Sequence, residues 1–216
     1  MSGTFPTTIL PRSFQVINNR PSLINQSVSG KRVTRKYGSQ YWTLEVGLPA
    51  LSKADGLDTY GFLQQQQGAF EKFSFTHPIH NRGDAGTRKE ADPPFPDVTA
   101  QVDGAHTAGD SSILLEGFSY TNVSGDILKR GDVIKFANHD KVYMITADVA
   151  NAEATVGGST DVTINIEPPL IADLANDEAV TLNKPTYSVY LTGDVGYTTD
   201  ASGLYYYNFT LRECIE

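Results

Sequence analysis

Hydrophobic and polar residues alternate along several short stretches of the chain, and this period of two predicts β-strands. Ile134 and Phe136 share one face of such a stretch. Residues 142–146 alternate in the same way after the turn-forming residues 137–140. Because the connection is so short, the two stretches are expected to pair as an antiparallel hairpin.

The hairpin belongs to a longer region of short strands and glycine-rich connections, residues 98–183. Residues 162–166 alternate in a further strand, which Pro168 should end because proline cannot donate to a strand ladder. Other alternating stretches lie at 98–102, 113–118 and 180–182. About six short strands in a region of this length are typical of a small β-barrel such as an OB-type fold.

The first half of the chain contains one clear strand and one helix. Four alternate apolar residues from Trp42 to Leu48 share one face, which predicts a strand with one buried and one wet face. A helix is predicted over 53–67 with Ser52 as its N-cap.

The helix has a spacing of three between Leu57, Tyr60 and Leu63, so these side chains are expected to lie along the sheet. The four glutamines at 64–67 are expected to form a polar last turn that faces water. Gly68 is expected to end the helix.

Two long amphipathic strands, 187–191 and 205–211, follow the barrel region and match the Trp42 strand better than the barrel. The sequence therefore predicts a mainly β protein: a discontinuous, sandwich-like domain with one helix, and an inserted small OB-like barrel. The predicted boundaries are 13–90 and 186–216 for the sandwich-like domain, 98–183 for the barrel and 1–12 for an N-terminal arm. Two connections are also predicted, a turn at 18–21 and a linker or long exposed loop at 77–97.

The formal charge of −8 divides unevenly along the chain. Residues 1–90 hold 11 Lys or Arg against 6 Asp or Glu, whereas residues 91–216 hold 6 against 19. The opposite charges could attract neighbouring copies of the chain, and solvated surface charge explains them equally well. Nucleic-acid binding is disfavoured because phosphate affinity comes from clustered cations, and the basic cluster at 31–36 is short.

The sequence contains no recognisable catalytic or metal-binding set, so we assign no catalytic, cofactor-binding or metal-binding residue and expect neither a cofactor nor an enzyme. His77 and His80 have a spacing seen among metal ligands, but no further ligand completes a site. The tripeptide at 130–132 matches a cell-adhesion motif, yet it opens a strand after a turn. Cys214 is the only cysteine, which excludes an internal disulfide.

Membrane insertion is not expected either. No apolar run approaches the roughly 20 residues that a membrane helix needs, and the N-terminus has no signal-peptide pattern. The sequence predicts a soluble protein that is not exported by the signal-peptide route.

Several packing patterns together resemble a known family. They are the segment Gln-Tyr-Trp-Thr-Leu at 40–44, the helix end at 61–68, the hairpin at 131–143 and the strand end at 166–170. With the tyrosine-rich final strand, the chain resembles the distal tail proteins of long-tailed, non-contractile bacteriophages. Within that family it is similar to the subgroup in which an OB-like barrel is inserted into a sandwich-like ring domain.

The resemblance implies a structural role in the virion. It implies a homo-oligomer, a hexameric ring at the tail tip, that joins the tail tube protein to the baseplate hub or tail tip protein. DNA would pass through the central channel without specific binding. Acidic residues such as Asp194 and Asp200 are expected to line that channel, because acids repel phosphate over about 8–10 Å at physiological salt.

Two other classes of function remain open. A carbohydrate-binding module acting in host-surface recognition would use exposed aromatic residues of the barrel, and the candidates are Phe95, Phe118, Tyr120 and Tyr143. A small hydrolase is the third class, and it ranks last because His is scarce and no nucleophile motif is present.

Overall fold

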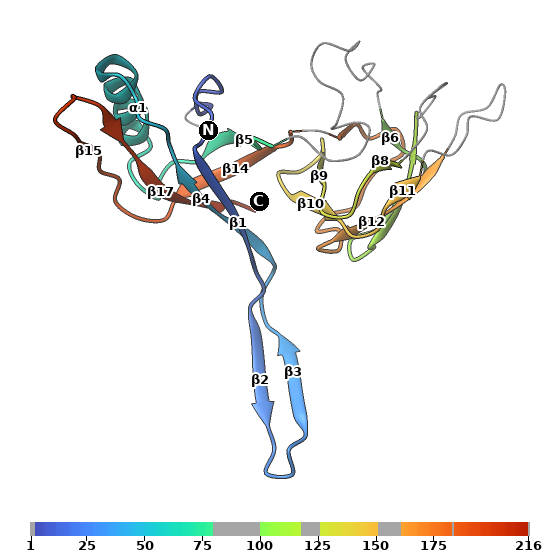
Figure 1. Ribbon diagram of the computed structural model, residues 1–216. Coiled ribbons are helices and arrows are strands. Elements are labelled where there is room, and N and C mark those ends of the chain that lie inside the picture. Colours follow the sequence, from blue (N-terminus) through green and yellow to red (C-terminus); the bar gives the residue numbers. More distant parts are fainter. Residues whose placement is uncertain (1–2, 80–99, 118–125, 151–160, 183, 216) are drawn as a thin grey trace. The chain divides into compact units, whose positions relative to one another are not determined.

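The computed structural model describes residues 3–79, 100–117, 126–150, 161–182 and 184–215 (Figure 1). Within these residues the protein is mainly β with one α-helix, as the sequence predicts. The chain divides into two compact units, which we describe separately. The sheet unit is Met1–Phe75 with Ser188–Ile215, and the barrel unit is Thr76–Tyr187.

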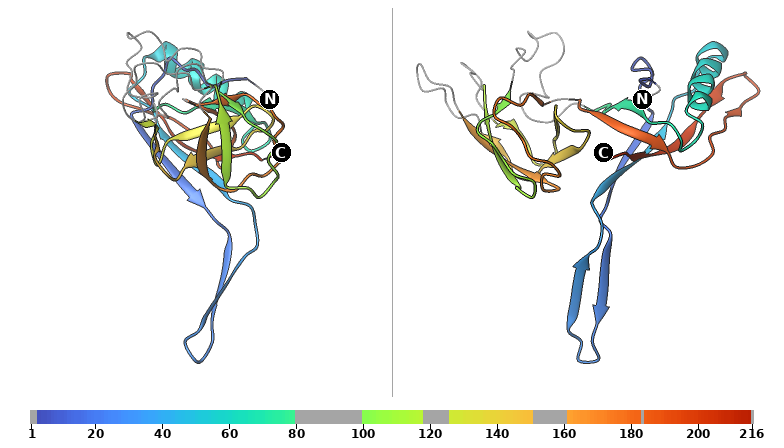
Figure 2. Two further views of the ribbon diagram at one scale, coloured as in Figure 1. Left: turned by 90° about the vertical axis from the view of Figure 1, so that its right-hand side faces the viewer. Right: turned by 180° about the vertical axis from the view of Figure 1, so that it is seen from behind.

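The sheet unit is built on five strands in the order β1-β4-β17-β14-β5 (Figure 2). The strands are β1 Ser13–Asn19, β4 Tyr41–Gly47, β5 Phe73–Thr76, β14 Thr186–Leu191 and β17 Asn208–Glu213. Both β1 and β17 run antiparallel to β4. Trp42, Leu44 and Val46 on β4 are at most 2% exposed, which confirms the predicted buried face of this strand.

The helix α1, Lys53–Gln65, begins at the predicted N-cap. The Oγ of Ser52 accepts a hydrogen bond from the backbone N–H of Asp55 at 3.2 Å, which satisfies one of the unpaired N–H groups of the first turn. The helix ends at Gln65 with Gln66 as its C-cap, two residues before the positive-φ Gly68.

The buried face of α1 differs from the predicted one. Gly56, Thr59 and Leu63 are the buried residues, while Leu57 is 43% exposed. Gly56 fixes this rotation, because a Cβ at its position would lie 2.6 Å from the Cγ of Tyr205. The prediction for the glutamines was also wrong in part: Gln66 is fully buried, and its amide donates to the carbonyl of Phe62 at 2.9 Å.

The N-terminal residues from Gly3, which the sequence assigns to an N-terminal arm at 1–12, belong to the sheet unit and contact β5. The N–H of Phe5 donates to the carbonyl of Ser74 at 2.8 Å, and the N–H of Ser74 donates to that of Gly3 at 3.0 Å. The Phe5 side chain is 4% exposed, with its ring centroid 5.5 Å from that of Phe75. The segment therefore covers the outer edge of β5.

The predicted strand at 205–211 is divided in the structure. β16, Tyr205–Tyr206, pairs with β15, Thr198–Thr199, in a separate two-stranded sheet. Tyr207 lies between β16 and β17, and its hydroxyl donates to the carbonyl of Gly56 at 2.6 Å. The backbone of this segment stays beside the residues that follow β4, since the carbonyl of Tyr207 accepts from the N–H of Leu48 at 3.0 Å.

A second two-stranded sheet extends from the first two strands of the main sheet. The predicted turn at 18–21 is wrong: β1 stays paired with β4 up to Asn19, whose amide donates to the Oγ1 of Thr43 at 2.7 Å. The chain continues into β2, Ser22–Gln26, and returns through β3, Arg32–Lys36. Figure 1 shows β2 and β3 running on from β1 and β4, with no other element of the sheet unit beside them. We call residues 20–37 the arm.

The barrel unit contains a six-stranded sheet in the order β13-β9-β10-β12-β7-β6. Its strands are β6 Gln101–Val102, β7 Ser112–Glu116, β9 Val133–Phe136, β10 Val142–Ile145, β12 Val162–Glu167 and β13 Val180–Thr181. A small sheet of β8, Asp126–Leu128, and β11, Val149–Ala150, lies beside them. The predicted hairpin at 134–146 and the strand before Pro168 are confirmed.

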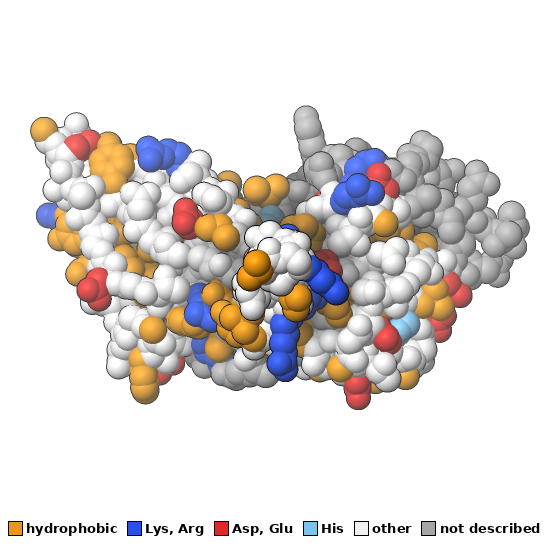
Figure 3. Space-filling view, turned by 90° about the horizontal axis from the view of Figure 1, so that it is seen from below, with side chains coloured by type: hydrophobic (Ala, Val, Ile, Leu, Met, Phe, Trp, Pro, Cys, Tyr) orange, Lys and Arg blue, Asp and Glu red, His pale blue; other side chains and the backbone are white. Residues whose placement is uncertain are grey.

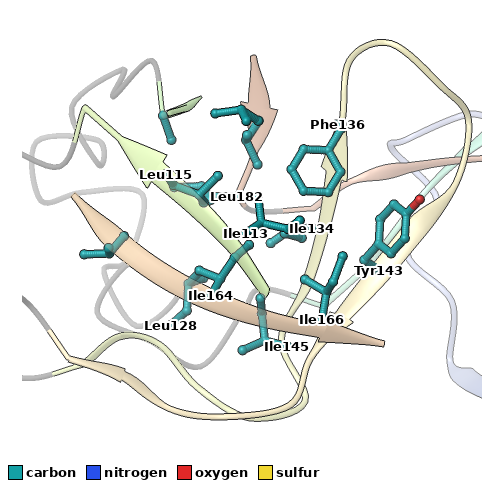
Figure 4. Packing of buried hydrophobic residues seen from close by; sticks show 14 of the residues in the cluster. Ile113, Leu115, Leu128, Ile134, Phe136, Tyr143, Ile145, Ile164, Ile166 and Leu182 are labelled. Carbon is teal, nitrogen blue, oxygen red and sulfur yellow. The ribbon is translucent and has the colours of Figure 1, made fainter. Parts of the chain in front are cut away.

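The two outer strands of this sheet come together, so the barrel is nearly closed. The N–H of Val102 donates to the carbonyl of Glu178, and the N–H of Val180 donates to that of Ala100, both at 2.9 Å. Ile134, Phe136, Tyr143 and Ile145 point into the enclosed core together with the isoleucines of β12 (Figure 4). The predicted small barrel is therefore present.

Acid is expected to destabilise the barrel unit through His139. The Nε2 of His139 lies 2.6 Å from the hydroxyl of Tyr143, and that hydroxyl accepts from the N–H of Ile171 at 3.2 Å. Burial and then the charge of Lys135 lower the pKa of His139 from 6.5 to about 4. The pKa of His139 is lower in the folded protein than in the unfolded chain. The neutral ring therefore contributes its full stability above pH 6.5, and this contribution is lost as the pH falls toward 4.

We expect a loss of about 1–2 kcal/mol between pH 7 and pH 4, which discounts the full shift because the ring is only half buried. Urea unfolding of the barrel unit at several pH values measures it. His139→Gln should flatten the profile over this range, although His77, whose pKa is also lowered by burial, keeps part of the dependence. An unchanged profile in the variant would exclude His139 as the cause.

Candidate assembly interface

The described part of the chain contains His, Cys, Asp and Glu residues that could bind a metal ion. No group of three or more potential metal ligands comes together among those residues. His77 is 8% exposed, and its Nδ1 lies 2.8 Å from the carbonyl oxygen of Ile79, whereas His80 falls outside the described residues. In the tripeptide at 130–132, Asp132 is 2% exposed and caps a turn by accepting from the N–H of Lys129 at 2.8 Å.

Of the four aromatic residues named for a carbohydrate site, the structure describes Tyr143. Tyr143 is fully buried in the barrel core. Phe95, Phe118 and Tyr120 lie outside the described residues. The structure therefore removes Tyr143 from that hypothesis.

The two acids that were expected to line a channel, Asp194 and Asp200, differ from each other in their surroundings. Asp200 holds the turn between β15 and β16, since its carboxylate accepts from the N–H groups of Ser202 and Leu204 at 2.9 and 3.0 Å. It also accepts from the hydroxyl of Tyr206 at 2.9 Å. These hydrogen bonds lower the pKa of Asp200. Asp194 is exposed and lies in a connecting segment.

The arm is the feature of the sheet unit that its own fold does not explain. All residues of β2 and β3 are exposed. A lone two-stranded hairpin is marginally stable in water, because neither of its faces is covered. Here both faces carry an apolar residue opposite a polar or basic one: Ile24 pairs with Thr34, and Leu23 pairs with Arg35.

The exposed apolar surface of the arm is large for its length. Leu23, Ile24 and Val33 are 60%, 61% and 58% exposed. Val28 at the tip and Tyr37 at the base are 109% and 65% exposed. Such a concentration of exposed apolar residues marks an interaction surface.

The arm is also strongly basic. It contains five cations and no Asp or Glu, and the cations are Arg20, Lys31, Arg32, Arg35 and Lys36. Figure 3 looks at the protein from the arm side and shows basic and hydrophobic side chains gathered together. The arm therefore fits a partner surface that is acidic and partly apolar.

Sequence reasoning missed the arm as a structural element. Its strands carry no clean apolar alternation, because no face of the hairpin is buried. A local signal was present nevertheless: Ser29-Gly30 separates two extended segments, and Gly30 has a φ of +79° in the turn.

Comparison with known proteins finds no protein-family model that matches the chain and no curated protein that is significantly similar to it. Among the described residues, α1 is the sole helix, and it is too short and too polar to span a membrane. The function must therefore be inferred from the fold and the arm.

Proposed function

We propose that this chain is a structural subunit of a bacteriophage tail tip, a distal tail protein whose copies form a ring. The ring would be hexameric, would join the tail tube protein to the baseplate hub or tail tip protein, and would leave a channel for DNA. The protein would act in the virion and would have no enzymatic activity. The observation that carries the proposal is the exposed, basic and apolar arm.

An arm of this kind favours a head-to-tail contact between copies. Each copy would place its arm on an unlike surface of the next copy, and such heterologous contacts close into a ring when the rotation between copies permits. Covering the five exposed apolar side chains would contribute roughly 5–8 kcal/mol per contact. Association costs about 4–15 kcal/mol, so a single contact is weak. Ring closure gives every copy two contacts and offsets this cost.

The architecture gives further support. A mainly β sheet unit with one helix, interrupted in sequence by a small barrel, is the arrangement that the resemblance to distal tail proteins implies. The uneven charge of the chain also favours attraction between unlike surfaces of neighbouring copies.

Sedimentation velocity over a range of protein concentrations tests the proposal. We expect monomers at low concentration and a discrete closed oligomer at high concentration, and salt should weaken the oligomer because the arm is basic. The purified tail tube protein should shift the equilibrium toward the ring. Monomers at every concentration, with and without the tube protein, would contradict the proposed function.

A further inference from the structure

The two helix glycines of α1 differ in a way that points to a contact outside the chain. Gly56 is explained by its own fold, because a Cβ there would collide with Tyr205. Gly61 is exposed, and an added Cβ would meet no atom within 4 Å. Glycine in a helix interior destabilises the helix relative to alanine. No close contact within the chain explains why residue 61 is a glycine.

The surface around Gly61 carries exposed apolar and aromatic groups. Leu57 lies one turn earlier on the same side of the helix and is 43% exposed. Tyr197 is 41% exposed, and its ring centroid lies 5.1 Å from that of Tyr60 and 5.0 Å from that of Tyr205. Tyrosine rings held in place by neighbours are typical of protein interfaces.

A hollow of about 260 Å³ lies at the end of the same helix. Val195 contributes an apolar side chain and Asp194 contributes a carboxylate, beside Gln64, two glycines and the nearly buried Leu63 and Leu191. The last turn of α1 contains no basic residue, so the negative end of the helix dipole is not neutralised by a side chain of that turn. The hollow therefore suits an apolar side chain followed closely by a cation.

The tip of the arm has this chemistry. Val28 is the most exposed large apolar residue among those described, and Lys31 and Arg32 follow it at the end of the turn. A valine side chain is small enough to enter the hollow and leaves room for the stem of a lysine. A groove of about 540 Å³ at the ends of β1, β4 and β17 is likewise lined by a single acid, Glu45, but it does not include a helix end.

We infer that the arm tip of one copy docks on the face formed by Leu57, Gly61, Tyr197 and the Asp194 hollow of the next copy. Val28 fills the hollow, Lys31 and Arg32 face Asp194 and the end of α1, and Gly61 lets the arm backbone approach the helix closely. This inference rests on the proposed ring and names its acceptor surface.

A charge exchange tests the contact in the full-length protein. Asp194→Lys and the double change Lys31→Glu with Arg32→Glu should each weaken assembly at least 10-fold by sedimentation, and combining them should restore it to within about 3-fold of the original. Glu45→Lys is the matched control, and it should leave assembly unchanged. If Asp194 lined the channel instead, Asp194→Lys would assemble normally, and that result would overturn the inference.

The substitution Gly61→Ala should change the stability of the fold and the strength of assembly in opposite directions. It should raise the Tm of the sheet unit by about 4 °C, because alanine favours the helix and meets no neighbour. It should nevertheless weaken assembly, a combination that misfolding cannot produce. In a Cys214→Ser background, Val28→Cys with Val195→Cys should cross-link neighbouring copies on oxidation.

The outcomes distinguish the two proposals. If deletion of the arm abolishes the ring while the Asp194 and Gly61 variants assemble normally, the arm acts on another surface, and only the inference fails. If the unaltered chain never assembles, the proposed function fails as well.

Discussion

Removal of the arm should leave the sheet unit folded and abolish assembly. Asn19 pairs with Tyr41, and Arg20 and Gln40 are the next residues in that register. Replacing residues 21–39 by Asn-Gly would close the hairpin with a two-residue turn of the favoured type. Because every residue of β2 and β3 is exposed, we expect the Tm to change by less than about 3 °C.

A milder change tests the same prediction with the arm in place. Replacing Leu23, Ile24 and Val33 by glutamine should weaken assembly at least 100-fold, since the lost apolar contact is worth about 3 kcal/mol or more. Leu10→Gln is the matched control, because Leu10 is 63% exposed and lies outside the arm. Assembly that survives both the deletion and the triple change would show that the arm has no part in it.

Truncation of the barrel core should destabilise one unit and spare the other. Phe136 is fully buried, and its ring centroid lies 5.4 Å from that of Tyr143. Phe136→Ala should cost about 3–5 kcal/mol, a large part of the 5–15 kcal/mol that stabilises a typical domain. The core cluster of the barrel contains only residues of the barrel unit.

The single tryptophan makes this prediction measurable. Trp42 is 1% exposed in the sheet unit, so its fluorescence follows the unfolding of that unit alone. In Phe136→Ala the barrel transition, followed by near-ultraviolet circular dichroism, should move to lower urea while the Trp42 transition stays in place. Phe70→Ala, at a side chain 79% exposed, is the control for the substitution itself. A Trp42 transition that moved with the barrel would mean that the chain unfolds as one body.

The parts of the fold that the sequence predicted are those with a local or one-sided signal. β4 was predicted because a strand with one buried face shows a period of two. The start of α1 was predicted because the Ser52 cap is formed by residues three apart. The barrel hairpin was predicted because its turn is short and its strands alternate.

The errors occurred where distant residues decide the structure. The buried face of α1 is set by Gly56 against Tyr205, and no local spacing reveals that contact. The same holds for Tyr207, whose hydroxyl donates to the carbonyl of Gly56, a residue more than a hundred positions away in sequence. The arm was missed for the opposite reason: it buries nothing within the chain, so no periodicity records it.

The acceptor face could not be predicted from the sequence either. Leu57 was expected from its spacing to lie along the sheet, and the structure shows it exposed one turn before Gly61. The residues of the hollow come from α1 and from residues 191–195, more than a hundred positions away in sequence. Only the folded sheet unit brings them together.

A cryo-electron microscopy reconstruction of the assembled chain tests the central claim most directly. We predict a closed ring with a central channel, in which the arm of each copy lies on the sheet unit of the next. A reconstruction in which copies meet through other surfaces while the arms extend into solvent would contradict this account.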